Sequence, residues 1–285
     1  MALADAVPGV SGGTIAFILG FYERLLGALG ALTGASGAPR RPALAYLAKL
    51  GLGWAAGMLL SAVVLAELLD EHIYALSSLF LGLTAASIPL IIRSEAQTLR
   101  AHRACCWCFP LGLLAVVGLA ALRRSPLIGA AVQMTALNVP DCLYMILTGA
   151  LAIGAMVLPG ISGSSVLMIF GVDVPALRAV RRVLALDFSA LPGLVILALG
   201  FAIGAAVFAR LVRRAMLRFR PQMLWAILGL MCGSLYAICL GPASMELSPL
   251  SIASFRPAAF VLGVAVLLAL EAISHALERH GKPHT

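Results

Sequence analysis

The sequence PGVSGGT at residues 8–14 returns almost unchanged as PGISGSS at residues 159–165. Both copies interrupt a long apolar stretch, and a shift of about 151 positions also aligns Gly20 with Gly171. Proline cannot donate a backbone hydrogen bond, and glycine reaches backbone angles that a helix excludes, so each copy predicts a break between two half-helices. We therefore expect two related halves, each built around one broken helix.

The composition indicates a membrane protein. Of the 285 residues 62% are hydrophobic and only 11% are charged, which excludes a water-soluble domain. The net charge of +8 comes from short basic clusters between apolar segments, so we expect no nucleic-acid partner. The chain opens MALAD, without a basic segment and a cleavage site, so no cleaved signal peptide is expected. The six cysteines form no paired framework, and we predict neither metal nor cofactor, with a soft-metal site at Cys105, Cys106 and Cys108 as the alternative.

The predicted fold is an all-α polytopic membrane protein. The first repeat, residues 1–125, has a re-entrant hairpin at about 4–29 and spans at about 44–69, 74–92 and 106–122. Residues 126–142 form an external connecting segment. The second repeat, residues 143–285, has a hairpin at about 143–172 and spans at about 194–212, 223–240 and 257–276.

Arginine clusters predict the orientation. Those at 40–41, 93–103 and 210–220, together with the C-terminus, are placed in the cytoplasm by the positive-inside rule. The loops containing Asp70 and Ser244 then face outward, provided that both interrupted segments return to the side they came from. Two clusters fall on the outer side, where they are expected to recruit anions or else mark a local error in the topology: Arg123 with Arg124, and Arg178 with Arg181 and Arg182.

The repeat extends beyond the motifs. A shift of about 147 aligns Gly53 and Gly57 with Gly200 and Gly204, a spacing of small residues that favours close helix packing. One hairpin followed by three spans gives each half an odd number of crossings, so the second half is expected to be inverted relative to the first. Inverted-topology repeats are typical of secondary transporters.

The broken helices predict an anion site near the bilayer midplane. A new helix that starts after each Pro-Gly exposes unpaired N–H groups and a positive dipole end, to which serine and threonine hydroxyls add donors. Capping and packing alone are the alternative explanation for these residues. The predicted substrate-binding residues are Pro8, Gly9, Ser11, Gly12, Gly13, Thr14, Pro159, Gly160, Ser162, Gly163, Ser164 and Ser165.

Three charged residues near the first motif are candidates for a secondary role. Asp5 could carry a coupling proton or cation, or be an ordinary acid near a helix end; its counterpart in the second half is Met156. Glu23 and Arg24 follow the motif and could contact the substrate or pair with each other.

At these residues the chain resembles the bacterial and archaeal membrane family of domain of unknown function 368. The resemblance rests on ADAVPGVSGGT at residues 4–14, GFYER at residues 20–24 and LPGISGS at residues 158–164, and it covers essentially the whole chain. Ser165 stands where family members often carry an apolar or aromatic residue. The resemblance implies a flippase that returns undecaprenyl phosphate from the outer to the inner leaflet of the bacterial inner membrane.

Two other functions stay open. A transporter of small soluble anions would use the same cradle. An intramembrane lipid-phosphate enzyme would need a nucleophile beside a base, and neither hairpin places a histidine or a paired carboxylate near its serines. We therefore predict a transporter and not an enzyme, with polyprenyl phosphate and membrane lipids as partners, and leave the oligomeric state open.

Overall fold

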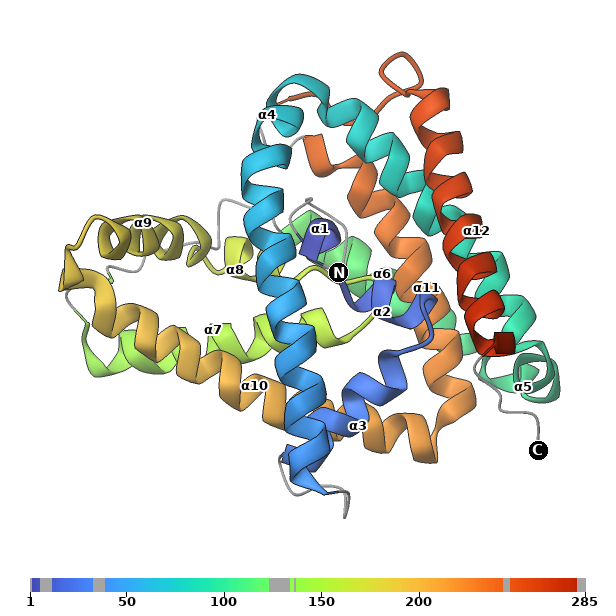
Figure 1. Cartoon of the computed structure of the whole chain (residues 1–285), viewed down its shortest axis with the longest axis horizontal. Coiled ribbons are helices and arrows are strands. Elements are labelled where there is room, and N and C mark those ends of the chain that lie inside the picture. The colour runs from blue at the N-terminus through green and yellow to red at the C-terminus, as the bar shows by residue number, and fades with distance from the viewer. Residues whose placement is uncertain are drawn as a thin grey trace.

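The computed structural model describes residues 2–5, 12–32, 39–122, 134–135, 137–242 and 247–280. The described part is helical and contains no strand, which confirms the predicted fold class. Figure 1 shows its helices, which are α1 (Ala2–Asp5), α2 (Gly12–Ile18), α3 (Tyr22–Leu32), α4 (Arg40–Ser94), α5 (Ala96–Ala101), α6 (Cys108–Leu122), α7 (Val139–Val157), α8 (Gly163–Ile169), α9 (Asp173–Leu184), α10 (Leu191–Arg218), α11 (Arg220–Cys239) and α12 (Pro257–His280). Short 3₁₀ turns, η1 (Arg103–Trp107) and η2 (Phe188–Ala190), precede α6 and α10.

Several helices are long and apolar enough to cross a membrane. Within the described residues they are His72–Ser94, Arg103–Leu122, Val139–Val157, Phe188–Arg218 and Arg220–Cys239. The helices Gly163–Ile169 and Asp173–Val183 form a further pair bent by 103°, the geometry of a broken span or a re-entrant loop. The chain is thus a multi-pass membrane protein.

The repeat seen in the motifs is present in the helices. The bounds of α8 are those of α2 moved by about 151 residues, and α9 begins at the same distance after α3. Each short helix ends at a glycine in the left-handed region, with φ of 73° at Gly20 and 66° at Gly171. Because L-residues with side chains rarely adopt this φ, glycine is required where the chain reverses in both halves.

A second matched feature is the break between the first two long helical segments of each half. Within α4, His72 leaves the helix with φ of −130° and ψ of 29°, and this bend lies at the upper edge of Figure 1. Phe219, between α10 and α11, has φ of −128° and ψ of 41°. The α4 helix therefore corresponds to α10 and α11 together.

The two halves interlock through glycines. A Cβ atom at Gly82 in α4 would strike the carbonyl oxygen of Phe260 in α12, and one at Gly229 in α11 would strike that of Phe109 in α6. Gly82 and Gly229 are counterparts in the repeat, so α12 packs against α4 in the way that α6 packs against α11. The last span of each half is thus held by the other half.

The predicted packing role of the small residues is confirmed at Gly200 and Gly204 but not at Gly53, where a Cβ atom would meet no other atom within 4 Å. A Cβ atom at Gly200 would lie 2.6 Å from the carbonyl oxygen of Ile146, and one at Gly204 would lie 2.5 Å from Ala150, both in α7. The absence of side chains therefore lets α10 approach α7 closely, and Figure 1 shows the two helices side by side in an arm that carries α9.

Candidate functional site

The two motifs meet in the interior. The backbone N–H of Gly160 donates a hydrogen bond of 2.8 Å to Oγ1 of Thr14, and both residues are buried. Gly160 has φ of 93°, and a Cβ atom there would lie 2.7 Å from the backbone of Leu230 in α11. Thr14 in α2 thus satisfies a backbone donor that the second break exposes, because an unpaired N–H at this depth would be costly.

Asp5 occupies the start of α2. Its Oδ1 accepts a 2.7 Å hydrogen bond from the backbone N–H of Gly12, and its Oδ2 accepts one of 3.0 Å from the indole Nε1 of Trp54 in α4. A Cβ atom at Gly12 would strike the Asp5 carboxylate. The helix start that the sequence predicts to attract an anion therefore contacts a carboxylate of the chain itself.

The start of α8 is built differently. Ser162 precedes the helix and is buried, and its Oγ lies 2.8 Å from the Oγ of Ser164. Met156 stands where the repeat places the counterpart of Asp5, so this half supplies no carboxylate at the equivalent position. Two hydroxyl groups and the first N–H groups of α8 are thus grouped without a matching acid.

A cavity of about 550 Å³ joins these groups. Its polar lining residues are Asp5, Trp54, Ser162 and Ser164. The remaining lining is small or apolar and comes from both halves: Leu29, Leu47, Leu50, Gly51, Ala152, Ile153, Met156, Gly163, Leu167 and Phe201. Such a cavity fits an amphiphile that has one compact polar group and an apolar chain.

Comparison with known proteins identifies the family. A family model described as undecaprenyl phosphate translocase-like matches residues 1–249. The chain belongs to this family. It is similar to the polyprenyl-phosphate transporter of Vibrio cholerae, with 31% identity over 245 residues, 82% of this chain and 73% of the relative. It is also similar to the polyprenyl-phosphate transporter of Staphylococcus aureus, with 27% identity over 284 residues, 96% of this chain and 94% of the relative. No solved structure matches.

The structure brings only part of the predicted site together. Within this family member, Gly12, Gly13, Thr14, Pro159 and Gly160 are buried around the junction of the two motifs. The residues that line the cavity are Ser162, Gly163 and Ser164, and Ser165 is half-buried beside them. The predicted site residues Pro8, Gly9 and Ser11 lie outside the described residues.

Trp54 is a site residue that the sequence analysis missed. A tryptophan within an apolar helix carries one N–H that needs an acceptor, and this requirement is a general signal of a nearby polar partner. The sequence does not say which of the chain's acids would supply that acceptor. The structure identifies it as Asp5.

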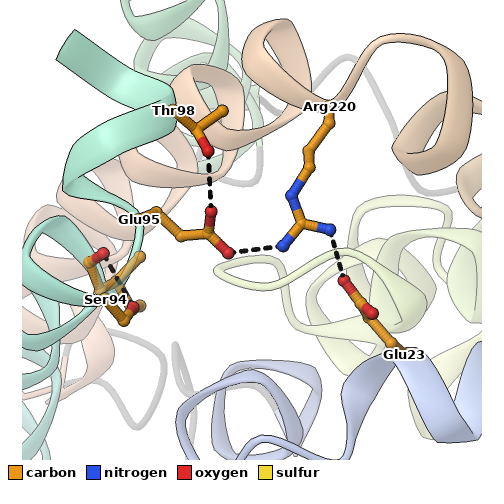
Figure 2. Close-up of polar contacts among 6 residues, drawn as sticks. Glu23, Ser94, Glu95, Thr98 and Arg220 are labelled. Atoms are coloured by element: carbon orange, nitrogen blue, oxygen red, sulfur yellow. Dashed lines mark hydrogen bonds and ion pairs between the residues drawn. The ribbon is translucent and has the colours of Figure 1, made fainter. Parts of the chain in front are cut away.

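Glu23 and Arg24 have partners on other helices. Figure 2 shows the guanidinium of Arg220, at the start of α11, between two carboxylates: Nη1 lies 2.9 Å from Glu23 and Nη2 lies 2.6 Å from Glu95. The guanidinium of Arg24 lies 4.8 Å from the ring centroid of Tyr46 in α4. Glu23 and Arg220 line a second cavity, of about 440 Å³, at this end of α3.

The α9 arginines, Arg178, Arg181 and Arg182, are all exposed. They share α9 with three exposed apolar side chains, those of Val174, Leu177 and Val180. A helix that exposes both kinds of residue suits the boundary between lipid tails and headgroups. Arg123 and Arg124 lie outside the described residues. In the part of the chain that the structure describes, no group of three His, Cys, Asp or Glu side chains could hold a metal ion.

Proposed function

We propose that this chain transports a polyprenyl phosphate across the bacterial cytoplasmic membrane, returning it from the outer to the inner leaflet. The observation that carries the proposal is the cavity between the two motifs, which combines a few polar groups with an otherwise apolar lining. The printed names of the two relatives, both polyprenyl-phosphate transporters, support this substrate.

The phosphate would bind between the starts of α2 and α8, near the bilayer midplane. Ser162 and Ser164 supply hydroxyl donors, and the first N–H groups of α8 are free of a carboxylate cap. The rest of the lining would hold the first isoprenoid units, while the remainder of the chain stays in the lipid. A long tail would then need no complete enclosure.

Asp5 gives the site a means of coupling. A bound phosphate and the Asp5 carboxylate would repel each other across one small cavity of low dielectric constant. Uptake of a proton by Asp5, or a shift of its side chain away from Gly12, would remove that repulsion and release an N–H donor to the substrate. We therefore infer that Asp5 carries the coupling proton, or stands beside the coupling cation.

The binding site would open alternately to the two sides of the membrane by exchanging equivalent helix contacts between the two repeats. The α3 helix packs against α10, and by the repeat the counterpart of this contact is a packing of α9 against the first part of α4. The lining of the cavity instead includes residues of α4 and of α8, the helix that precedes α9. The opposite state would form when α9 moves onto α4 and α3 leaves α10, as expected for inverted repeats.

Two alternatives make different predictions. A small soluble anion would gain little from a cavity wall that is mainly apolar. A lipid phosphatase would need a general base beside Ser162 or Ser164, and the only acid in the cavity lining, Asp5, is bonded to Gly12 and Trp54. Both observations favour transport of an intact lipid.

The test is reconstitution of the purified protein into liposomes, with a leaflet-specific assay of polyprenyl phosphate. We expect the lipid to exchange between leaflets faster than in protein-free liposomes, and a water-soluble phosphate ester to compete poorly. Accumulation of the soluble ester without lipid exchange would instead assign the chain to small anions. Release of inorganic phosphate from the lipid would identify an enzyme.

A further inference from the structure

A third pocket, which is basic, lies where several helix ends meet. It is separate from the cavity between the motifs and from the cavity beside Glu23. It measures about 470 Å³ and is formed by the end of α4, α5, η1 and the first turns of α11. Its rim carries Arg93, Arg100 and Arg103, and its apolar lining includes Leu99, Trp225 and Leu228. Charged groups thus surround an opening into an apolar space.

Within the described residues, no ion pair neutralises the positive charge at this pocket. All three arginines are exposed, and in the described part of the chain none of them forms an ion pair. The acid nearest in sequence, Glu95, is bound to Arg220. Three guanidinium groups at one pocket mouth therefore remain available for an external anion.

Two candidate spans and a tryptophan beside the pocket indicate that it faces the boundary between hydrocarbon and lipid headgroups. The spans His72–Ser94 and Arg220–Cys239 have ends beside it, and the indole Nε1 of Trp225 donates a 3.3 Å hydrogen bond to the carbonyl oxygen of His102. Tryptophan favours the boundary between hydrocarbon and headgroups. An occupant would therefore come most readily from the surrounding leaflet.

The pocket arginines have no counterparts at the equivalent positions of the second half. The shift of about 147 that aligns Gly82 with Gly229 places Leu240 and Leu247 opposite Arg93 and Arg100. The other half thus uses apolar residues at the corresponding positions. This difference favours a binding role on one face of the membrane over a role in folding.

We propose that this pocket binds an anionic glycerophospholipid of the cytoplasmic leaflet. The arginines would bind its phosphate, and one acyl chain would enter along Leu99, Trp225 and Leu228. Zwitterionic lipids also carry a phosphate, but they would place a cationic headgroup beside three guanidinium groups. The pocket should therefore select for net negative charge, whatever substrate the chain transports.

Tryptophan fluorescence can test this selection. The chain has three tryptophans, and replacing Trp54 and Trp107 with phenylalanine leaves Trp225 as the only one. This variant is reconstituted into phosphatidylcholine vesicles in which a fixed fraction of the lipid is either brominated phosphatidylglycerol or brominated phosphatidylcholine. We expect phosphatidylglycerol to quench at a mole fraction at least about fivefold lower, since each arginine near an anionic surface contributes about a factor of five.

Matched variants separate specific binding from general charge. In the same background, Arg93→Gln, Arg100→Gln and Arg103→Gln together should abolish the preference, and three Arg→Lys changes should restore part of it. Arg40→Gln, Arg41→Gln and Lys49→Gln remove the same charge elsewhere on α4 and should leave the preference intact. Equal quenching by both lipids in the parent, or a preference that survives the three pocket glutamines, would overturn the proposal. Circular dichroism of each vesicle sample verifies that the variant is folded.

Discussion

The hydrogen bond between Thr14 and Gly160 offers a direct test of how the two motifs are joined. Replacing Thr14 with valine keeps the side-chain shape and removes the acceptor, so the buried N–H of Gly160 loses its 2.8 Å partner. A buried donor left unpaired costs about 1–3 kcal/mol. For a chain of this size, a loss of about 2 kcal/mol lowers the melting temperature by about 4–8 °C.

The control for Thr14→Val is Thr14→Ser, which keeps the hydroxyl group and removes only a methyl group. We expect Thr14→Val to unfold earlier in detergent and to exchange polyprenyl phosphate more slowly in liposomes, because the two breaks are no longer tied. Thr14→Ser should retain most of both properties. A valine variant that matches the parent in melting temperature and exchange rate, while the serine variant is impaired, would refute the bond and leave only packing at this position.

Four further predictions concern the site and the topology. Ser164→Ala should slow lipid exchange without lowering the melting temperature, because Ser164 lines the cavity and is exposed. Gly163→Val should lower the exchange rate and the melting temperature, since its Cβ atom would lie 2.8 Å from the carbonyl oxygen of Ala152. Asp5→Asn should make exchange insensitive to an imposed pH gradient; a retained response would place the coupling group elsewhere. Replacing the three α9 arginines with glutamine should slow uptake more at low salt than at high salt, because surface attraction is screened beyond about 8–10 Å at moderate ionic strength; an unchanged salt dependence would exclude recruitment by α9. A cysteine at Ser244, in a variant without the native cysteines, should react with an impermeant reagent added to intact cells, and protection would contradict the predicted orientation.

Features that depend on local sequence could be predicted. Pro159 and Gly160 end a helix because one lacks an N–H and the other adopts a positive φ, and these are properties of the residues themselves. Apolar length also predicted the helices His72–Ser94, Arg103–Leu122, Phe188–Arg218 and Arg220–Cys239, which are long enough to cross a membrane. The repeat was also visible, since matched glycines such as Gly20 and Gly171 carry out the same turn in both halves.

Pairings between distant residues were decided only by the tertiary structure. No local pattern predicts that Trp54 donates to Asp5, that Thr14 pairs with Gly160, or that Arg220 bridges Glu23 and Glu95. The polar groups of Asp5, Thr14 and Gly160 need partners because an unpaired polar group in the interior is costly, and the sequence indicates that need. Which partner each receives depends on how the helices that carry these residues lie against one another, and that is set by the close packing of whole helices.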